Sequence, residues 1–142
     1  MSEKIKKVVG VAFIKEGKLL ISQSLRSSKT NSWTFIGGGV EDGETIEMAA
    51  VREVSEEIHN GFSITPNDLS YVMTFKESAA SDPNLKIEMN IFICNKKIDV
   101  ELTPNEEILR YHWYKIGEEE YNISSSIRDH FLPYAMKNGL MN

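Results

Sequence analysis

The sequence contains a single cysteine, Cys94, so no disulfide bond can form within the chain. Cys94 lies in an apolar run, which favours a buried thiol and fits a reducing compartment. The polar, lysine-rich residues 1–7 are not followed by the long apolar run that a signal peptide or a membrane span requires. We therefore expect a cytoplasmic protein that does not interact with membranes.

Basic charge is also scarce, because 16 Lys and Arg residues face 21 Asp and Glu residues, for a net charge of -5. This balance disfavours a nucleic-acid groove, since phosphate-backbone binding needs a surplus of clustered basic side chains. An anionic small molecule would have to be bound locally, by a metal ion or by a few basic residues. The length of 142 residues suits one domain over residues 1–142.

The order of apolar and turn-forming residues predicts a chain rich in strands. Residues 8–14 and 19–22 are apolar and β-branched around a turn at 16–18, which predicts a hairpin. A short strand is expected over 33–36, followed by a glycine-rich, acidic loop over 37–44. The other expected segments are strands over 69–77, 85–95 and 111–114, with loops over 26–31 and 78–84.

Two helices complete the expected fold. Apolar residues recur every four positions from Ile46 to Ile58, which predicts a central helix over about 45–59 with Thr45 as its N-cap. A second helix is expected over about 125–138, ended by Gly139. Many strands with one central and one C-terminal helix indicate the α+β class, or an α/β/α sandwich around a mixed β-sheet.

Three carboxylates share one face of the central helix, because Glu53, Glu56 and Glu57 stand at positions i, i+3 and i+4. Like charges at this spacing repel each other by about 0.2–0.5 kcal/mol per pair, which suggests a compensating cation. Hard oxygen ligands suit Mg2+ or Mn2+. Arg52 can pair with Glu44 or Glu56, and the preceding glycines let the backbone approach a metal and phosphates. The alternative is an ordinary solvated acidic surface.

The residues from Gly38 read GGVEDGETIEMAAVREVSEE, which resembles the Nudix box, G-x5-E-x7-R-E-u-x-E-E-x-G-u, where u is a bulky aliphatic residue. Residues 33–38 and 106–113 resemble the segments that flank this box in the family. The positions in register with the box are Gly38, Glu44, Arg52, Glu53, Val54, Glu56 and Glu57.

Three positions depart from the family pattern. Ile36 stands where the family usually has proline, His59 replaces the closing glycine, and Asn60 replaces the last aliphatic residue. His59 and Asn60 tolerate the left-handed conformation that ends a helix better than most residues, and Gly61 takes it freely, so the end of the helix is expected to shift by a residue or two. No departure touches a carboxylate.

The resemblance implies a role for each matching residue. Glu56 and Glu57 would be the principal metal ligands, together with the carbonyl of Gly38. Glu53 would be a ligand or the base for the attacking water, and Arg52 with Glu44 would orient the carboxylates. Glu106 or Glu107 is a candidate for an additional carboxylate, or part of a solvated loop. Arg26 and Lys29 are candidates for binding substrate phosphates.

The implied activity is Mg2+- or Mn2+-dependent cleavage of the diphosphate linkage in a nucleoside diphosphate derivative. The first candidate substrates are normal or oxidised nucleoside triphosphates, cleaved to the monophosphate and pyrophosphate. The alternatives are an ADP-ribose or nucleotide-sugar pyrophosphatase, and a Nudix module that binds nucleotides without hydrolysing them. The expected partner is therefore a small nucleotide, and the protein is expected to be a monomer or homodimer.

Overall fold

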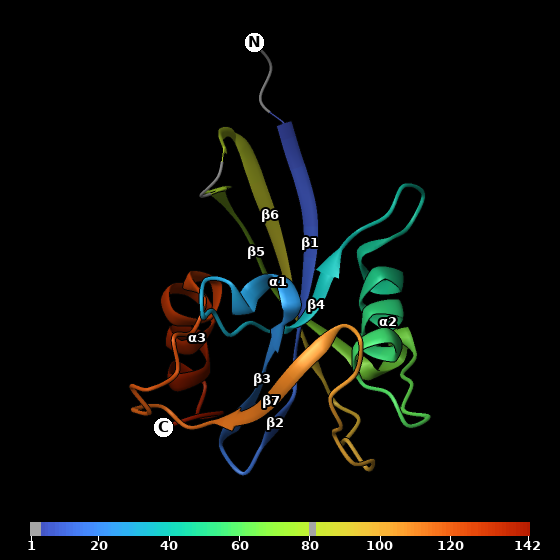
Figure 1. Cartoon of the computed structure of the whole chain (residues 1–142), viewed down its shortest axis with the longest axis vertical. Helices are drawn as coiled ribbons and strands as arrows, with labels where there is room; N and C mark the ends of the chain where they lie inside the picture. Colours follow the sequence, from blue (N-terminus) through green and yellow to red (C-terminus); the bar gives the residue numbers. More distant parts are fainter. Residues whose placement is uncertain (1–3, 80–81) are drawn as a thin grey trace.

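The apolar, β-branched segments form two β-sheets in the computed structural model, which describes residues 4–79 and 82–142 (Figure 1). The first sheet has the strand order β4 (Ile36–Gly39), β1 (Lys4–Ala12), β6 (Asp82–Cys94) and β5 (Leu69–Ala79). β1 runs parallel to β6, and the other neighbouring strands are antiparallel. The second sheet is antiparallel, with the order β2 (Ile14–Lys15), β3 (Lys18–Ser24) and β7 (Ile108–Tyr114).

Two of the helical segments correspond to the helices expected from the sequence. These are α2 (Ile46–Glu57) and the C-terminal segment, in which a wide π-type turn, η2 (Ser126–Phe131), continues into α3 (Leu132–Lys137). The structure adds α1 (Leu25–Ser28) and the single turn η1 (Pro66–Asp68). The α+β class is confirmed, and so is the mixed sheet.

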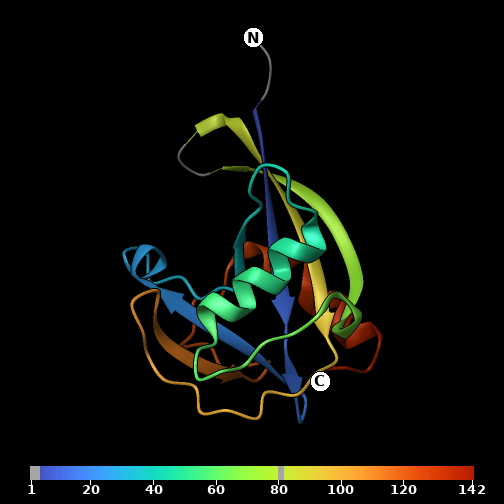
Figure 2. The same ribbon diagram turned by 90° about the vertical axis from the view of Figure 1, so that its right-hand side faces the viewer.

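Helical layers cover the strands from two sides (Figures 1 and 2). Along β1, Val9 and Val11 belong to a core cluster that also contains Val54 of α2. The opposite face of β1 carries Ala12, which lies in a second core cluster with Phe131 from the C-terminal segment. Alternating side chains of one strand thus pack against different helices, as the period of two in a strand requires.

The predicted hairpin over residues 8–22 is only partly correct. Its turn is confirmed, since Glu16 and Gly17 have φ angles of 53° and 76°, and Ile14 pairs with Leu19. The strand before the turn, however, divides at Phe13, and β1 belongs to the other sheet. β1 pairs there with β4 and β6, which are distant in the sequence.

The loop expected over residues 26–31 is wrong at its start, where the chain forms α1. Serines at both ends of this turn satisfy each other's backbone groups, as in a reciprocal cap. The N–H of Ser24 donates to Oγ of Ser27 at 2.8 Å, and the N–H of Ser27 donates to Oγ of Ser24 at 3.1 Å. This local bonding makes a short helix without the apolar period that identifies longer ones.

The strand expected over residues 33–36 is displaced. Trp33 and Thr34 form only isolated bridges, whereas β4 runs through the glycines that were expected to form a loop. In β4, Gly37 pairs with Gly10, and a Cβ atom at Gly37 would lie 2.0 Å from the carbonyl oxygen of Val9. Glycine usually weakens a strand, but here it permits a close approach of two backbones.

The loop expected over residues 78–84 is also wrong, because β5 extends to Ala79 and β6 begins at Asp82. Residues 80 and 81 lie outside the described part of the chain. Nζ of Lys86 donates to Oγ of Ser78 at 2.6 Å across this extension. The last strand, β7, begins at Ile108, three residues before the predicted position.

The ends of α2 agree closely with the sequence. Oγ1 of Thr45 accepts a hydrogen bond from the N–H of Met48 at 3.1 Å, which confirms the predicted N-cap. After the C-cap Ile58, Asn60 and Gly61 have φ angles of 66° and 84°, which confirms the left-handed conformation expected there, whereas His59 does not adopt it. Among the described residues, no helix is both long and apolar enough to cross a membrane.

Candidate active site

A cleft of about 510 Å³ lies where α2 faces the glycines of β4. The backbone of residues 37–39 forms one wall, and side chains of α2 form another. The other lining residues are Lys6, Ser24, Leu25, Glu41, Glu106 and Glu107. The cleft therefore unites four of the matching box residues, Gly38, Arg52, Glu53 and Glu57, with segments from both sheets.

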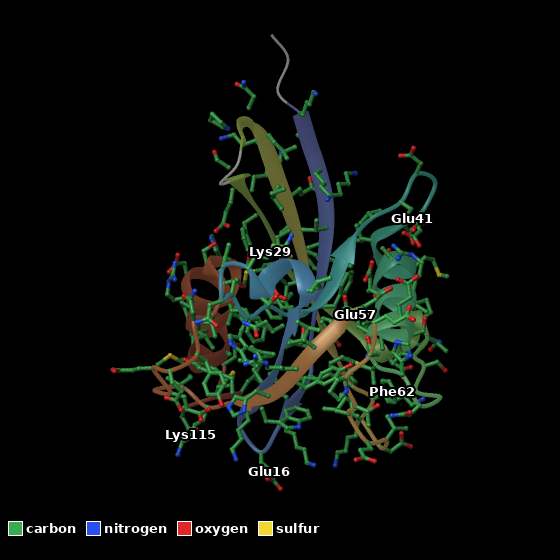
Figure 3. The ribbon with its side chains drawn as sticks, viewed as in Figure 1. Glu16, Lys29, Glu41, Glu57, Phe62 and Lys115 are labelled. Carbon is green, nitrogen blue, oxygen red and sulfur yellow. The ribbon has the colours of Figure 1, made fainter. Side chains whose placement is uncertain are left out.

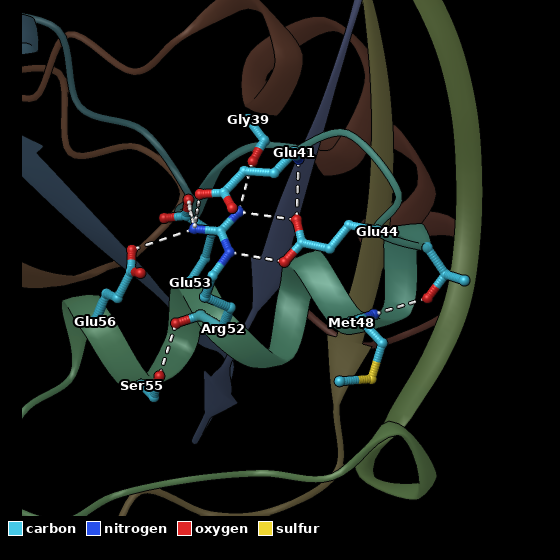
Figure 4. A network of polar contacts seen from close by, with 9 residues as sticks. Gly39, Glu41, Glu44, Met48, Arg52, Glu53, Ser55 and Glu56 are labelled. Atoms are coloured by element: carbon cyan, nitrogen blue, oxygen red, sulfur yellow. Dashed lines mark hydrogen bonds and ion pairs between the residues drawn. The ribbon is translucent and has the colours of Figure 1, made fainter.

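Arg52 is the centre of the polar network in this cleft (Figure 4). Its Nε and Nη2 donate to the two carboxylate oxygens of Glu44 at 2.7 and 3.0 Å, which is a bidentate pair. Nη1 donates to Glu53 at 2.9 Å and to Glu56 at 3.2 Å, and Nη2 also donates to the carbonyl of Gly39 at 2.8 Å. One guanidinium thus joins α2 to the glycine strand.

The pair between Arg52 and Glu44 is held in its ionised form. Hydrogen bonds from Arg52 and from the backbone N–H of Glu41 lower the pKa of Glu44 to about 2. The bond to Glu44 in turn raises the pKa of the Arg52 guanidinium, and Glu53 adds to that effect. Glu44 and Arg52 therefore connect the loop at Glu41 rigidly to the middle of α2.

Glu53 lies against the backbone of Gly38. The residue is 8% exposed, and a Cβ atom at Gly38 would lie only 2.6 Å from its carboxylate. Burial raises the pKa of Glu53, against the opposing effect of its bond from Arg52. The absence of a side chain at Gly38 is therefore what gives this carboxylate its place at the β4 wall.

Glu57 reaches the same wall one helical turn later, and it is also 8% exposed. Its Oε1 accepts a hydrogen bond from the N–H of Gly37 at 3.0 Å. Burial raises the pKa of Glu57 to about 9, although the N–H of Gly37 opposes the shift, and the nearby charge of Glu53 raises it further. Two neighbouring carboxylates are therefore desolvated together, and of the two only Glu53 has an ion pair with Arg52.

This donor set suits a hard divalent cation. Two buried carboxylates beside a glycine backbone offer the oxygen atoms that Mg2+ and Mn2+ prefer. No three His, Cys, Asp or Glu side chains of the described residues converge into a complete metal cage. Mg2+ tolerates such an open arrangement, because it usually keeps several waters and binds one or two carboxylates together with substrate phosphates.

Glu56 is placed differently from its two neighbours. Its side chain is 41% exposed, and it reaches the site through the hydrogen bond from Arg52. It lies at the rim and not against the glycine wall.

The loop before β7 carries Glu106 and Glu107 into the lining of the cleft, where both residues are exposed. Asn105 shapes this loop, since its Oδ1 accepts hydrogen bonds from the N–H groups of Glu107 and Ile108, each at 2.9 Å. Its Nδ2 donates to the hydroxyl of Tyr111 at 2.9 Å.

Tyr111 connects this loop to α2, because its hydroxyl donates to the carbonyl of Glu57. Burial raises the pKa of Tyr111, which keeps the hydroxyl a donor. Sequence reasoning missed both Asn105 and Tyr111. An asparagine that follows Pro104 in a polar stretch signals a turn. Nothing local, however, indicates that Nδ2 of Asn105 donates to the carbonyl of Glu57, which is 48 positions away in the sequence.

The two expected phosphate-binding residues have different outcomes. Lys29 is exposed beyond α1 and does not line the cleft that contains Glu57; both residues are labelled in Figure 3. The side chain of Arg26 lies outside what the structure describes. Lys6, which sequence reasoning did not single out, lines the cleft instead.

A second cavity, also of about 510 Å³, lies elsewhere on the molecule. Its lining includes Phe13, Lys15, Cys94, Lys97 and Trp113. None of the site residues expected from the sequence lines it. The chemistry of the cleft at α2 therefore has no counterpart in this cavity.

Comparison with known proteins identifies relatives over most of the chain. The NUDIX domain family profile matches residues 4–134. An 8-oxo-dGTP diphosphatase of Proteus vulgaris is 33% identical over 93 residues, which cover 64% of this chain and 76% of that protein. A Caenorhabditis elegans protein named as a nudix hydrolase is 30% identical over 105 residues, or 74% of this chain. The chain spans only 26% of that longer relative.

Solved structures show the same fold. A MutT protein from Methanosarcina mazei Go1 superposes with a TM-score of 0.76 at 19% identity, covering 97% of this chain and 98% of the other. The ORF135 protein of E. coli has a TM-score of 0.70 at 24% identity, covering 96% and 91%. At these identities the likeness establishes the arrangement of strands and helices.

Proposed function

The chain belongs to the Nudix hydrolase family, and from that membership we propose that it cleaves nucleoside triphosphates, normal or oxidised, in a Mg2+- or Mn2+-dependent reaction. The products would be the nucleoside monophosphate and pyrophosphate. The named activity of the Proteus vulgaris relative, an 8-oxo-dGTP diphosphatase, supports this choice of substrate.

The observation that carries the proposal is the pair of buried carboxylates against the glycine wall. Glu57 accepts the N–H of Gly37, and the carboxylate of Glu53 lies beside Gly38. We assign Glu53, Glu57, the carbonyl of Gly38 and, from the rim, Glu56 as the residues that would hold the cation. A bound divalent cation would supply charge neutralisation of the phosphate oxygens and activation of the attacking water.

The other side chains have supporting roles in this proposal. Arg52 and Glu44 are positioning residues, since their ionised pair aims the carboxylates at the cleft. Glu53 is also the candidate to accept the proton of the attacking water, because burial raises its pKa. Glu106 or Glu107 would add a further carboxylate from the opposite wall.

The decisive experiment is a release assay for phosphate and pyrophosphate with Mg2+. The substrates are normal and oxidised nucleoside triphosphates, ADP-ribose, nucleotide sugars and dinucleoside polyphosphates. Glu57→Gln is the test variant, and Glu47→Gln, on the same helix but outside the cleft lining, is the matched control. We expect pyrophosphate release from triphosphates, lost by orders of magnitude in Glu57→Gln and kept in Glu47→Gln.

The other outcomes identify the alternatives. If only ADP-ribose or nucleotide sugars are hydrolysed, they are the substrates in place of the proposed nucleoside triphosphates. No turnover with any substrate, together with nucleotide-induced thermal stabilisation, would indicate a binding module. Full activity in Glu57→Gln, or activity that persists in a chelator, would overturn the assignment of the site.

A further inference from the structure

Positive charge is scarce in the cleft. Five carboxylates line it or reach into it, from Glu41, Glu53, Glu57, Glu106 and Glu107. The cationic side chains that the structure describes in the lining are those of Arg52 and Lys6. A polyphosphate substrate would meet mostly repulsion here unless cations face it.

Arg52 is already fully engaged. Its guanidinium donates to three carboxylates and to the carbonyl of Gly39, as described above. By contrast, the described part of the structure contains no ion pair or hydrogen bond of the Lys6 side chain. Lys6 is exposed, so its ammonium is free to meet an anionic ligand in the cleft.

The position of Lys6 follows from the pairing of β1 with β4. Val8 pairs with Gly39, and Lys6, two residues earlier in β1, lies on the same face of the strand as Val8. A Cβ atom at Gly39 would lie 3.6 Å from Cε of Lys6. The aliphatic stem of Lys6 therefore runs beside the backbone of Gly39, where no side chain stands in its way.

Lys6 is also displaced along β4 from the proposed reacting centre. Glu57 accepts the N–H of Gly37 and the carboxylate of Glu53 lies beside Gly38, whereas the stem of Lys6 lies beside Gly39. Successive strand residues face opposite sides and advance the chain by about 3.3 Å, so Lys6 reaches the cleft from the face of β4 opposite to the one beside Glu53, next to the centre and not within it. The terminal phosphate of a triphosphate, which lies one phosphate beyond the cleaved linkage, would reach this position.

We propose that the ammonium of Lys6 binds an oxygen of the terminal phosphate of a nucleoside triphosphate, one phosphate further from the cleaved linkage, and so favours nucleoside triphosphates over nucleotide sugars. This inference rests on the proposed function and adds the residue that selects the substrate class. A triphosphate has a charged group at its distal end, whereas a nucleotide sugar has a neutral one. A lysine ammonium suits a phosphate oxygen as a compact charge with several donors.

The test compares Lys6→Met with Lys7→Met. The control removes the same charge from the next residue of β1, which is also exposed but points to the other face and does not line the cleft. In Lys6→Met we expect KM for a nucleoside triphosphate to rise about tenfold, with kcat changed less than about twofold, as for loss of a charge-assisted hydrogen bond. KM for a nucleotide sugar should change little.

The conservative variant separates charge from structure. Lys6→Arg keeps the positive charge and a long stem, so we expect most of the affinity for the triphosphate to return. Lys7→Met should have the kinetics of the wild type with both substrates. An equal rise of KM in Lys6→Met and Lys7→Met would mean that only net charge matters, and would overturn the proposal.

Equilibrium binding tests the inference independently of turnover. The probe is the α,β-methylene analogue of dGTP in Mg2+, measured by calorimetry, and its Kd should rise about tenfold in Lys6→Met. Suppose that hydrolysis requires Glu57 but the Kd values of Lys6→Met and Lys7→Met are equal. This result would refute the role of Lys6 and leave the proposed function standing. If the wild type hydrolyses none of the substrates but Lys6→Met binds the analogue more weakly, the role of Lys6 in binding is supported and the proposed hydrolysis is refuted.

Discussion

At the scale of a single residue, the burial of Glu57 lowers the stability of the metal-free protein. Its carboxylate is buried beside Glu53 and receives a hydrogen bond from the N–H of Gly37. The same burial that disfavours its charge lowers the local dielectric constant, and so strengthens the attraction to a cation bound there. The residue therefore favours metal binding at the expense of the stability of the metal-free protein.

The loss of stability caused by burying Glu57 should depend on pH. In the folded protein, burial raises the pKa of Glu57 from 4.5 to about 9, so the folded state holds this proton more tightly than the unfolded state. Stability is therefore lost as pH rises from about 4.5 towards 9 in the absence of metal. In EDTA, Glu57→Gln should be more stable than the wild type at pH 8, with a smaller difference at pH 5.

Thermal unfolding of both proteins at the two pH values measures this effect. Glu47→Gln is the control, because it removes a carboxylate from the same helix outside the cleft. A difference in Tm between Glu57→Gln and the wild type that stays constant from pH 5 to pH 8 would contradict the prediction.

At the scale of elements, the site depends on two connections to α2. Arg52 joins the helix to β4 through the carbonyl of Gly39. The other connection joins its C-terminal end to β7, through Tyr111 and the carbonyl of Glu57. Asn105 supports the second connection and also orders the loop that carries Glu106 and Glu107.

Asn105→Ala should loosen this loop. The change leaves the N–H groups of Glu107 and Ile108 without their acceptor and removes the donor to Tyr111. We expect the free energy of unfolding to fall by about 1–2 kcal/mol, in the range for lost hydrogen bonds. Hydrogen exchange at the amides of Glu107 and Ile108 should become faster.

Urea unfolding and amide exchange together measure this prediction. Asn95→Ala is a suitable control, because Asn95 is exposed and its side chain donates to Oγ of Ser70, far from the cleft lining. Unchanged exchange at Glu107 in Asn105→Ala would show that the loop does not depend on this asparagine.

At the scale of the whole molecule, the cleft is assembled from both sheets and from α2. It contains β4 and Lys6 of β1 from one sheet, the end of β3 from the other, and the loop before β7. A ligand bound there contacts segments that are far apart in the sequence. Such binding should stabilise the fold as a unit, because the unfolded chain has no comparable site.

Mg2+ should therefore raise the Tm of the wild type. A concentration of about 100 times Kd stabilises the folded state by about 2.7 kcal/mol. The shift should be larger at pH 8 than at pH 5, because protons compete with the cation for the carboxylates. It should disappear in EDTA and be much smaller in Glu57→Gln.

Differential scanning fluorimetry with and without Mg2+ tests this expectation. NaCl at the same ionic strength serves as the control for screening of the net negative charge. An equal rise of Tm with NaCl, or in Glu57→Gln, would show that the cation acts on the general charge and not at the proposed site.

The sequence by itself determined the features that arise from neighbouring residues. The apolar period and the cap at Thr45 located α2 closely, and the spacing of Glu53, Glu56 and Glu57 placed them on one face. The sequence also predicted that Arg52 pairs with Glu44 or Glu56, and Arg52 pairs with both. Helix periods, caps and spacing along a helix depend on contacts within one or two turns, which makes them readable locally.

Only the tertiary structure decided which distant segments meet. The glycines of β4 form a strand because β1 accepts them as a partner, and β1 leaves the expected hairpin for the same reason. Lys6 enters the cleft through that pairing, and Tyr111 reaches Glu57 across 54 residues. Strand pairing and cleft lining depend on long-range contacts and burial, and no local pattern around Lys6 or Tyr111 encodes them.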